Sequence, residues 1–300
     1  MGTEYRKVNM YCEVVEFAAD LDNINSFKFS GGEVHVKQAF RTKRLVARIR
    51  TSDDFMKLLL VADAHKRENG ELFELILPYM PYARQDRVME RGEALSLKVF
   101  CDIINNVGFP KVYVGDPHSD VTLALLNNSK SVCVPDEYFF ESYYVKLKEM
   151  SYSHKQEEDS IFKVVSFDNY VVVAPDAGAY KKLSKSFKKT PLIYAVKNRD
   201  TKTGYISKLS VHGYEDIDLT GKRLLVVDDI CDGGRTFIML AEALRNAGID
   251  NPLELYVTHG IFSNGFDELF KHYDFIHTTD SFYQDSSNGR LKVIKYFDCE

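Results

Sequence analysis

The sequence reads Arg223-Leu-Leu-Val-Val-Asp-Asp-Ile-Cys-Asp-Gly-Gly-Arg-Thr-Phe237 at its most informative point. The apolar residues from Leu224 to Val227 predict a buried parallel strand, which ends in two carboxylates, Asp228 and Asp229. A loop with two glycines comes next. From residue 237 onward, apolar side chains recur at helical spacing until Gly248, which predicts a helix directly after the loop.

The loop between strand and helix is predicted to bind a phosphate. Its residues are Asp232, Gly233, Gly234, Arg235 and Thr236. The glycines let backbone N–H groups approach an oxygen ligand, and the helix start adds partial positive charge. The threonine hydroxyl and the arginine guanidinium also suit phosphate. The two acids before the loop suit vicinal sugar hydroxyls or a phosphate-bound Mg²⁺. An ordinary strand-to-helix turn is the alternative, but paired acids at a strand end are unfavourable unless something binds them.

Length and composition narrow the class of protein. A chain of 300 residues predicts about two domains. A net charge of -5 argues against a general nucleic-acid or membrane surface. There is no run of eighteen apolar residues and no signal-peptide core at the N-terminus. Five scattered cysteines without a CxxC pair indicate a reducing compartment. We therefore expect a cytoplasmic globular protein that binds neither nucleic acid nor membrane.

Strand and helix patterns alternate along the whole chain, which predicts an α/β fold with largely parallel sheets. Helices are expected over residues 52–70, 94–107 and 137–150, besides a lysine-rich helix after Ala179 and the one after residue 237. Strands are expected over 34–36, 46–49, 72–77, 111–115, 170–174, 192–196, 253–257, 275–279 and 291–296. The segment 151–160 is polar enough for a linker, so two domains are predicted, 1–145 and 146–300.

The segment from Pro78 to Arg87 is predicted to bind a nucleobase. Two prolines exclude a regular element, so a rigid loop leaves the preceding strand. The loop carries two tyrosines and then Arg84, Gln85 and Asp86. Aromatic, amide and guanidinium groups suit stacking on a base and hydrogen bonding to it. A solvated charged loop is the alternative.

Two further strand ends carry candidate ligands. Asp116, His118 and Asp120 alternate after a short strand, which indicates a metal or phosphate site. Asp176 and Gly178 follow the strand 170–174, where βα loops of α/β folds bind ligands.

A polar loop is expected over residues 197–204. It carries Lys197 and Arg199, with Gly204 as a possible hinge. A mobile loop that brings two cations to a reacting polyphosphate is a recurrent device in enzymes. An exposed hairpin turn is the alternative.

Together these segments resemble the ribose-phosphate pyrophosphokinase family. The most specific match is Pro-Tyr-Ala-Arg-Gln-Asp-Arg at 81–87. The other matches, in the family's order, are Phe-Ser-x-Gly-Glu at 29–33, Asp-x-His at 116–118, Pro-Asp-x-Gly at 175–178, Lys-x-Arg at 197–199 and the phosphate loop. Phosphoribosyltransferases of type I would share only the last of these.

The resemblance implies two tandem phosphoribosyltransferase-like domains and a homo-oligomer, either a dimer or a hexamer. It implies that the diphosphate of ATP passes to the 1-hydroxyl of ribose 5-phosphate with Mg²⁺, giving phosphoribosyl diphosphate and AMP. By position, the resemblance implies that ATP is bound by Phe29, Glu33, Arg84, Gln85 and Asp86, the first two reaching a neighbouring subunit, and that Mg²⁺ is bound by His118 and Asp176. It implies that the ribose hydroxyls are bound by Asp228 and Asp229, and the 5-phosphate by Asp232 to Thr236. The catalytic residues that it implies are Lys197, Arg199 and His118.

Three positions depart from the family's pattern. Gly31 stands where the family usually has an aspartate that helps to read the adenine amino group. The phosphate loop usually reads Asp-Thr-x-Gly-Thr, so Gly233 replaces a threonine and Arg235 a small residue. Ala179 replaces the second glycine of Pro-Asp-x-Gly-Gly. Arg235 could serve a diphosphate, which makes ADP-ribose an alternative acceptor and links the enzyme to NAD metabolism. A non-catalytic regulatory relative is a third reading, but the retained motif residues argue against it.

Overall fold

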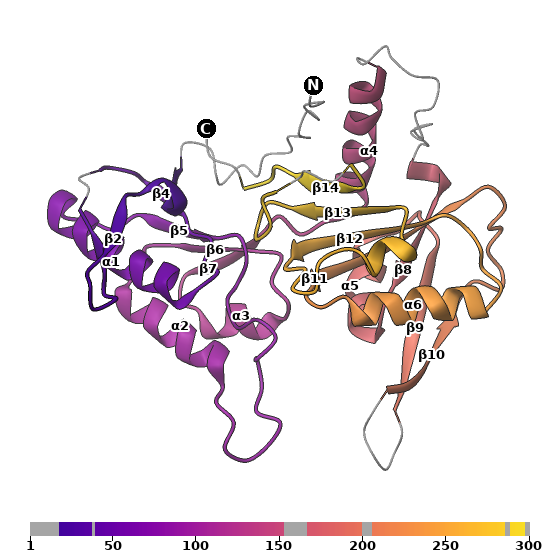
Figure 1. Ribbon diagram of the computed structural model, residues 1–300, viewed down its shortest axis with the longest axis horizontal. Coiled ribbons are helices and arrows are strands. Elements are labelled where there is room, and N and C mark those ends of the chain that lie inside the picture. The colour runs from indigo at the N-terminus through magenta and orange to yellow at the C-terminus, as the bar shows by residue number, and fades with distance from the viewer. Residues whose placement is uncertain (1–17, 38–39, 153–166, 200–205, 286–288, 298–300) are drawn as a thin grey trace. The chain divides into compact units, whose positions relative to one another are not determined.

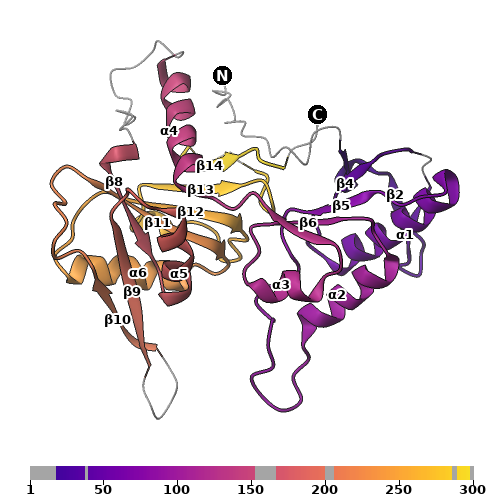
Figure 2. The same cartoon turned by 180° about the vertical axis from the view of Figure 1, so that it is seen from behind.

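The computed structural model describes residues 18–37, 40–152, 167–199, 206–285 and 289–297. The chain forms two compact units, each with its own sheet (Figures 1 and 2). The C-terminal unit includes Pro135–Thr279 and Tyr283–Lys295. Of the described residues, the N-terminal unit holds 18–37, 40–134, Asp280–Phe282 and 296–297. The chain therefore changes unit between Val134 and Pro135, and short segments from its C-terminal end return to the N-terminal unit.

The sheet of the N-terminal unit has five parallel strands in the order β1-β4-β5-β6-β7. The strands are β1 (Ala19–Asp20), β4 (Arg44–Val46), β5 (Glu74–Leu77), β6 (Val112–Gly115) and β7 (Ser129–Val132). The helices are α1 (Ser52–Asn69), α2 (Ser96–Val107) and α3 (Asp120–Leu125), with a 3-10 turn at Leu21–Asn23. A separate antiparallel hairpin pairs β2 (Ser26–Lys28) with β3 (Val34–Val36). The parallel α/β arrangement confirms the predicted fold class.

Helix α1 begins and ends where the sequence indicates. Thr51 caps its first turn: the side chain accepts from the Asp54 N–H, and the Asp54 carboxylate accepts from the Thr51 N–H at 2.8 Å. This reciprocal pair satisfies donors that the helix leaves free. Gly70 takes the left-handed conformation at the other end, with φ of 77°. The helix therefore matches the prediction for residues 52–70.

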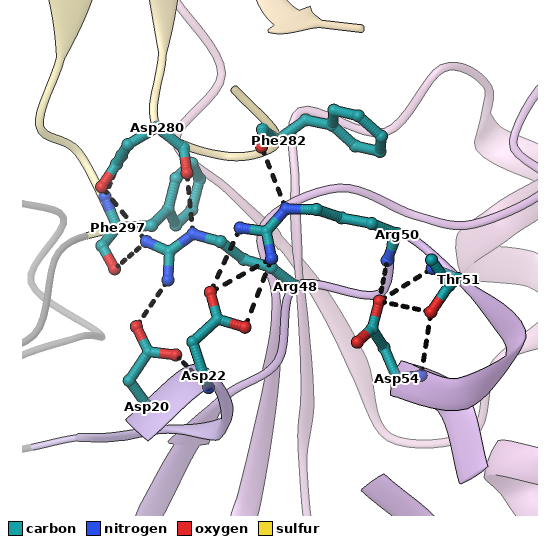
Figure 3. Close-up of polar contacts among 9 residues, drawn as sticks. All are labelled: Asp20, Asp22, Arg48, Arg50, Thr51, Asp54, Asp280, Phe282 and Phe297. Carbon is teal, nitrogen blue, oxygen red and sulfur yellow. Dashed lines mark hydrogen bonds and ion pairs between the residues drawn. The ribbon is translucent and has the colours of Figure 1, made fainter. Parts of the chain in front are cut away.

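A buried arginine organises the N-terminal unit (Figure 3). Arg48 is 1% exposed and donates to the carboxylates of Asp20 and Asp280 and to the carbonyls of Asp280 and Phe297. Arg48 Nε lies 2.7 Å from the Asp280 carbonyl oxygen, and Nη2 lies 2.8 Å from that of Phe297. Arg48 follows β4, whereas Asp280 and Phe297 belong to the two returning segments. One side chain thus holds these segments to the sheet. The sequence did not predict this contact.

The sheet of the C-terminal unit has seven strands in the order β10-β9-β8-β11-β12-β13-β14, with β10 alone antiparallel to its neighbour. The strands are β8 (Tyr170–Ala174), β9 (Leu192–Arg199), β10 (Ile206–His212), β11 (Arg223–Cys231), β12 (Leu253–Gly260), β13 (Phe275–Thr279) and β14 (Leu291–Ile294). The helices are α4 (Glu137–Tyr152), α5 (Ala177–Ser186) and α6 (Arg235–Asn246), with 3-10 turns at Phe167–Asn169 and Leu269–Lys271.

Helices α4 and α6 cover opposite faces of this sheet (Figures 1 and 2). Because side chains alternate along a strand, one set, including Val226 and Leu255, packs in a core with Leu240 of α6. The other set includes Tyr256, whose ring lies 4.8 Å from that of Phe140 in α4. Both faces are apolar, so the strands read as continuous hydrophobic runs.

The structure corrects several predicted boundaries. β9 runs to Arg199 and pairs with β10, so Lys197 and Arg199 lie in a strand rather than in the predicted loop. Gly204 and most of the predicted linker lie outside the described residues. β1, β2, β7, α3 and β10 were not predicted.

Cys133 is disulfide-bonded, contrary to the expectation of reduced cysteines, whereas Cys101 and Cys231 are free and buried. Among the described residues, no helix has the length and apolar character to cross a membrane.

Candidate active site

Three carboxylates gather at the carboxyl edge of the C-terminal unit's sheet. β8 and β11 are parallel neighbours, with Val173 opposite Val226. Asp176 follows β8, while Asp228 and Asp229 lie within β11. β11 extends past the predicted strand end because Ile230 and Cys231 still pair with β12. The two acids are therefore fixed by the sheet rather than by a loop.

The electrostatics of this cluster are unfavourable without a ligand. Burial, the charge of Asp229 and the charge of Asp176 together raise the pKa of Asp228 well above its usual range. Asp228 Oδ1 accepts from the Asp229 N–H at 3.0 Å, which offsets part of this effect. Asp229 is 9% exposed, and its Oδ1 accepts from the Ile230 N–H at 2.9 Å. Hydroxyl donors or a cation bound at these carboxylates would relieve the repulsion.

Asp176 also caps α5. Its Oδ1 accepts from the N–H groups of Gly178 and Ala179, both at 3.0 Å. The cap fixes the carboxylate after the end of β8. Ala179 is buried in the first turn of the helix, so its methyl group fits where the family usually has a glycine.

The predicted phosphate loop joins β11 to α6. Gly234 caps the helix in the left-handed conformation, with φ of 80°, and α6 begins at Arg235. Arg235 is exposed, and no hydrogen bond or ion pair engages its guanidinium within the part of the chain that the structure describes. Thr236 is half-buried beside it. The loop therefore presents a helix start and a cation to solvent, as an anion site needs.

The N-terminal unit joins two of the predicted segments through Asp86. Its carboxylate accepts from Ser119 Oγ at 2.8 Å and from Arg87 Nε at 2.9 Å. These contacts, with the nearby charge of His118, lower the pKa of Asp86 despite partial burial. Asp86 is 7% exposed, so it ties the 81–87 loop to the loop that carries His118. The sequence alone did not identify Ser119 as a partner of Asp86.

The other predicted ATP residues are accessible. Arg84 and Gln85 are exposed in the 81–87 loop. Phe29 is 53% exposed at the end of the β2–β3 hairpin, and its ring packs with Phe27 and His35 at centroid distances of 5.2 and 5.7 Å. Glu33 is exposed on the same hairpin, where its carbonyl accepts from the Phe29 N–H at 2.9 Å. An exposed aromatic platform suits a nucleobase.

The remaining predicted residues are placed by backbone alone. Lys197 pairs with Leu209 and Arg199 with Ile206 across β9 and β10; their side chains lie outside the described part of the structure. Two contacting residues were missed by sequence reasoning: Ser263 and Asn264, after β12, both hydrogen-bond to the phosphate loop. The only signal for them was their place after a strand that neighbours β11.

A preformed metal cage is absent from the described residues, where no three His, Cys, Asp or Glu side chains are grouped to hold an ion. Mg²⁺ does not require one, because it commonly binds through one or two carboxylates together with substrate phosphates. Asp176, the metal candidate of this unit, has the hard oxygen donors that this ion prefers. The chain's residues therefore fit a cation that arrives with a nucleotide.

Family models match both parts of the chain. The model for the N-terminal domain of ribose phosphate pyrophosphokinase matches residues 14–108, and the phosphoribosyl transferase domain model matches residues 148–264. The ribose-phosphate pyrophosphokinase of Mycoplasmopsis pulmonis is 27% identical over 270 residues, which cover 87% of this chain and 76% of that protein. That of Pyrococcus furiosus is 28% identical over 254 residues, covering 82% and 81%.

A solved structure has the same fold. The phosphoribosylpyrophosphate synthetase from Mycobacterium smegmatis matches with a TM-score of 0.66 and 21% sequence identity, over 90% of this chain and 85% of that chain. Fold, motif order and both family models agree, and the chain belongs to the ribose-phosphate pyrophosphokinase family.

Proposed function

We propose that this enzyme transfers the diphosphate of ATP to the anomeric 1-hydroxyl of ribose 5-phosphate. The oxygen of that hydroxyl bonds to the β-phosphorus, and the bond from the β-phosphorus to the α,β-bridging oxygen breaks. AMP leaves with that oxygen, and the hydroxyl proton is released. The products are phosphoribosyl diphosphate and AMP. Such transfers depend on in-line positioning and charge neutralisation rather than on a covalent residue.

The observation that carries this proposal is the carboxylate cluster beside the phosphate loop. Asp228 and Asp229 would accept hydrogen bonds from the ribose hydroxyls, and this contact would relieve the repulsion that raises the pKa of Asp228. Residues Asp232 to Thr236 would hold the 5-phosphate at the start of α6.

The remaining roles follow from family membership. Phe29, Glu33, Arg84 and Gln85 would bind ATP, and Asp86 would keep its loop in place through the hydrogen bond from Ser119. Lys197 and Arg199 would stabilise the transition state. Asp176 would bind Mg²⁺, which neutralises charge on the transferred phosphates, and His118 is a further candidate ligand. We also propose a homo-oligomer, in which a neighbouring subunit contributes to the nucleotide site.

The test is AMP release from ATP and Mg²⁺ with ribose 5-phosphate as the sole acceptor. We expect AMP and an equal amount of a product that carries its diphosphate on carbon 1, identified by phosphorus NMR. The reaction should stop when EDTA removes the metal, and it should fail in an Asp229→Asn variant that unfolds at the wild-type temperature. Absence of AMP with every acceptor would contradict the proposal and favour a regulatory protein.

Arg235 favours a second candidate acceptor, ADP-ribose. Its guanidinium is exposed at the first residue of α6 and unengaged among the described residues, so it could meet the second phosphate of a diphosphate group. The same assay with ADP-ribose as the sole acceptor separates the candidates. ADP-ribose would be the substrate if its kcat/KM were higher than that of ribose 5-phosphate. Arg235→Ala should then lose the activity on ADP-ribose while it keeps the activity on ribose 5-phosphate.

A further inference from the structure

The segment after β12 is joined to the phosphate loop residue by residue. The Ile261 N–H donates to the Cys231 carbonyl at 2.8 Å. Ser263 Oγ donates to Asp232 Oδ1 at 2.6 Å, and Asn264 Nδ2 donates to the Gly233 carbonyl at 3.2 Å. β11 and β12 are parallel neighbours up to Cys231 and Gly260, so the sheet brings these two segments together. The contact is therefore a built feature of the fold.

Asn264 occupies the space above Gly233. A Cβ atom at position 233 would lie 2.8 Å from Asn264 Nδ2, which is closer than real side chains approach. Gly234 is constrained differently, by its φ of 80° and by Leu269, which a Cβ would meet at 3.1 Å. A side chain is therefore unfavourable at the two loop glycines for different reasons. A side chain at position 233, where the family usually carries threonine, would displace the Asn264 amide from its present place.

The chemistry of this amide suits a phosphate. Because the Asn264 side chain faces the Gly233 carbonyl, which can only accept, its amide nitrogen must point toward that carbonyl. One N–H is used there, and the second has no partner among the described residues. Asn264 is exposed, so a ligand can reach it. An amide N–H is a suitable donor to a phosphate oxygen.

We propose that Asn264 is a specificity-determining residue of the acceptor site, supplying the phosphate of the ribose-phosphate substrate with the donor that the family's threonine would supply. This inference rests on the proposed function. Ser263 is a positioning residue: its hydroxyl occupies one oxygen of Asp232 and turns that carboxylate toward the 261–264 segment.

The first test compares Asn264→Ala and Asn264→Asp with Asp267→Asn, an exposed control in the same segment. Calorimetric binding of ribose 5-phosphate alone and the KM values of both substrates are measured. We expect Asn264→Ala to weaken acceptor binding roughly tenfold, and Asn264→Asp to weaken it further because the new charge repels phosphate. The KM for ATP should stay the same. An unchanged acceptor KM in both variants would overturn the inference.

Failure of the proposed function has a different signature, because the wild-type protein itself would then neither bind nor use ribose 5-phosphate. ADP-ribose would in that case replace it as the probe in the same variants.

A residue exchange tests the shared space directly. Gly233→Thr alone should weaken acceptor binding at least tenfold, because the new side chain would displace the Asn264 amide from its hydrogen bond to the residue 233 carbonyl. Adding Asn264→Gly should restore binding to within about threefold of wild type, since residues in contact are energetically coupled. Thermal unfolding of all variants shows whether the fold is intact. Additive losses in the double variant would show that the two side chains do not compete for one place.

Discussion

Arg48 and Asp280 form a buried ion pair, with Nη2 lying 3.1 Å from Oδ2 (Figure 3). Asp20 Oδ2 lies 2.6 Å from Nη1, so one cation serves two buried acids. Burial lowers the pKa of Arg48, but the two carboxylates more than compensate and raise it overall, which keeps the guanidinium charged. The second oxygen of Asp280 accepts from the N–H groups of Tyr296 and Phe297 at 2.8 Å. Every partner in this group is hydrogen-bonded.

Replacing Arg48 should therefore destabilise the protein strongly. Arg48→Met keeps most of the volume but leaves two buried carboxylates without a counter-charge, a loss of about 3–5 kcal/mol in similar sites. Urea unfolding at neutral pH measures the change. Arg67→Met is the matched control, because Arg67 pairs with Asp63 on the exposed face of α1. Equal stability of the two variants would mean that the buried pair has no net effect.

Glu254 should make stability depend on pH in the acid range. This carboxylate is 3% exposed and accepts from Tyr144, Tyr170, Arg223 and His277 at 2.7–3.0 Å. Burial raises its pKa, but these partners, His277 first among them, lower it to about 2. A pKa below that of the unfolded chain stabilises the fold above about pH 4.5, and the effect is lost as pH falls toward 2.

The variant Glu254→Gln tests this. We expect it to unfold more easily at neutral pH, with a difference from wild type on the order of 3 kcal/mol that shrinks as pH falls from about 4.5 to 2. Urea unfolding across this range measures it, and Glu268→Gln, at an exposed ion pair, is the control. A difference that stays constant with pH would argue that packing, rather than charge, is what the mutation removes.

Asp228→Asn should separate stability from activity. Because burial and two neighbouring carboxylates raise the pKa of Asp228, the folded state loses stability as pH rises from the carboxyl's unfolded pKa through its folded one. Removing the charge should raise Tm at pH 7–8, while AMP release falls at least tenfold. Thermal unfolding at several pH values and the AMP assay measure both. A lower Tm at neutral pH would show that the carboxylate stabilises the empty site.

The sequence predicted the helices and strands whose own residues follow a helical or strand pattern. The strand 170–174 and the strand 275–279 have the predicted bounds, and both sheets are largely parallel as expected. β7 was missed because its sequence, Ser-Lys-Ser-Val, has three polar residues in a row and only one apolar residue. β9 extends beyond the predicted strand because β10 pairs with its polar end, a tertiary contact that local pattern cannot show.

The candidate site was predictable where a motif was continuous. Asp228, Asp229 and the phosphate loop could be read from one stretch, and the pairing of β8 with β11 brings Asp176 to the same edge. Asn264 could not be found this way. It is distant in sequence from Gly233, and its role depends on the space that one glycine leaves.

Gly31→Asp should change nucleotide selectivity without harming the fold. A Cβ atom at position 31 would meet only Glu33 Oε2, at 3.9 Å, so the aspartate usual in the family fits. We expect the variant to prefer ATP over GTP more strongly than wild type, with kcat/KM for each nucleotide as the measurement. Gly32→Asp is the contrasting change, because its φ of 91° strains any side chain. An unchanged preference would show that Gly31 lies away from the base.

Lys197→Ala should slow turnover far more than it weakens binding. We propose that Lys197 acts on the transition state, and cations that act there contribute several powers of ten to comparable phosphoryl transfers. We expect kcat to fall at least a hundredfold, with the KM of both substrates changing less than about threefold. Steady-state kinetics with each substrate varied in turn measures both. Lys185→Ala, on the exposed side of α5, is the matched control. A raised KM with an unmoved kcat would make Lys197 a binding residue instead.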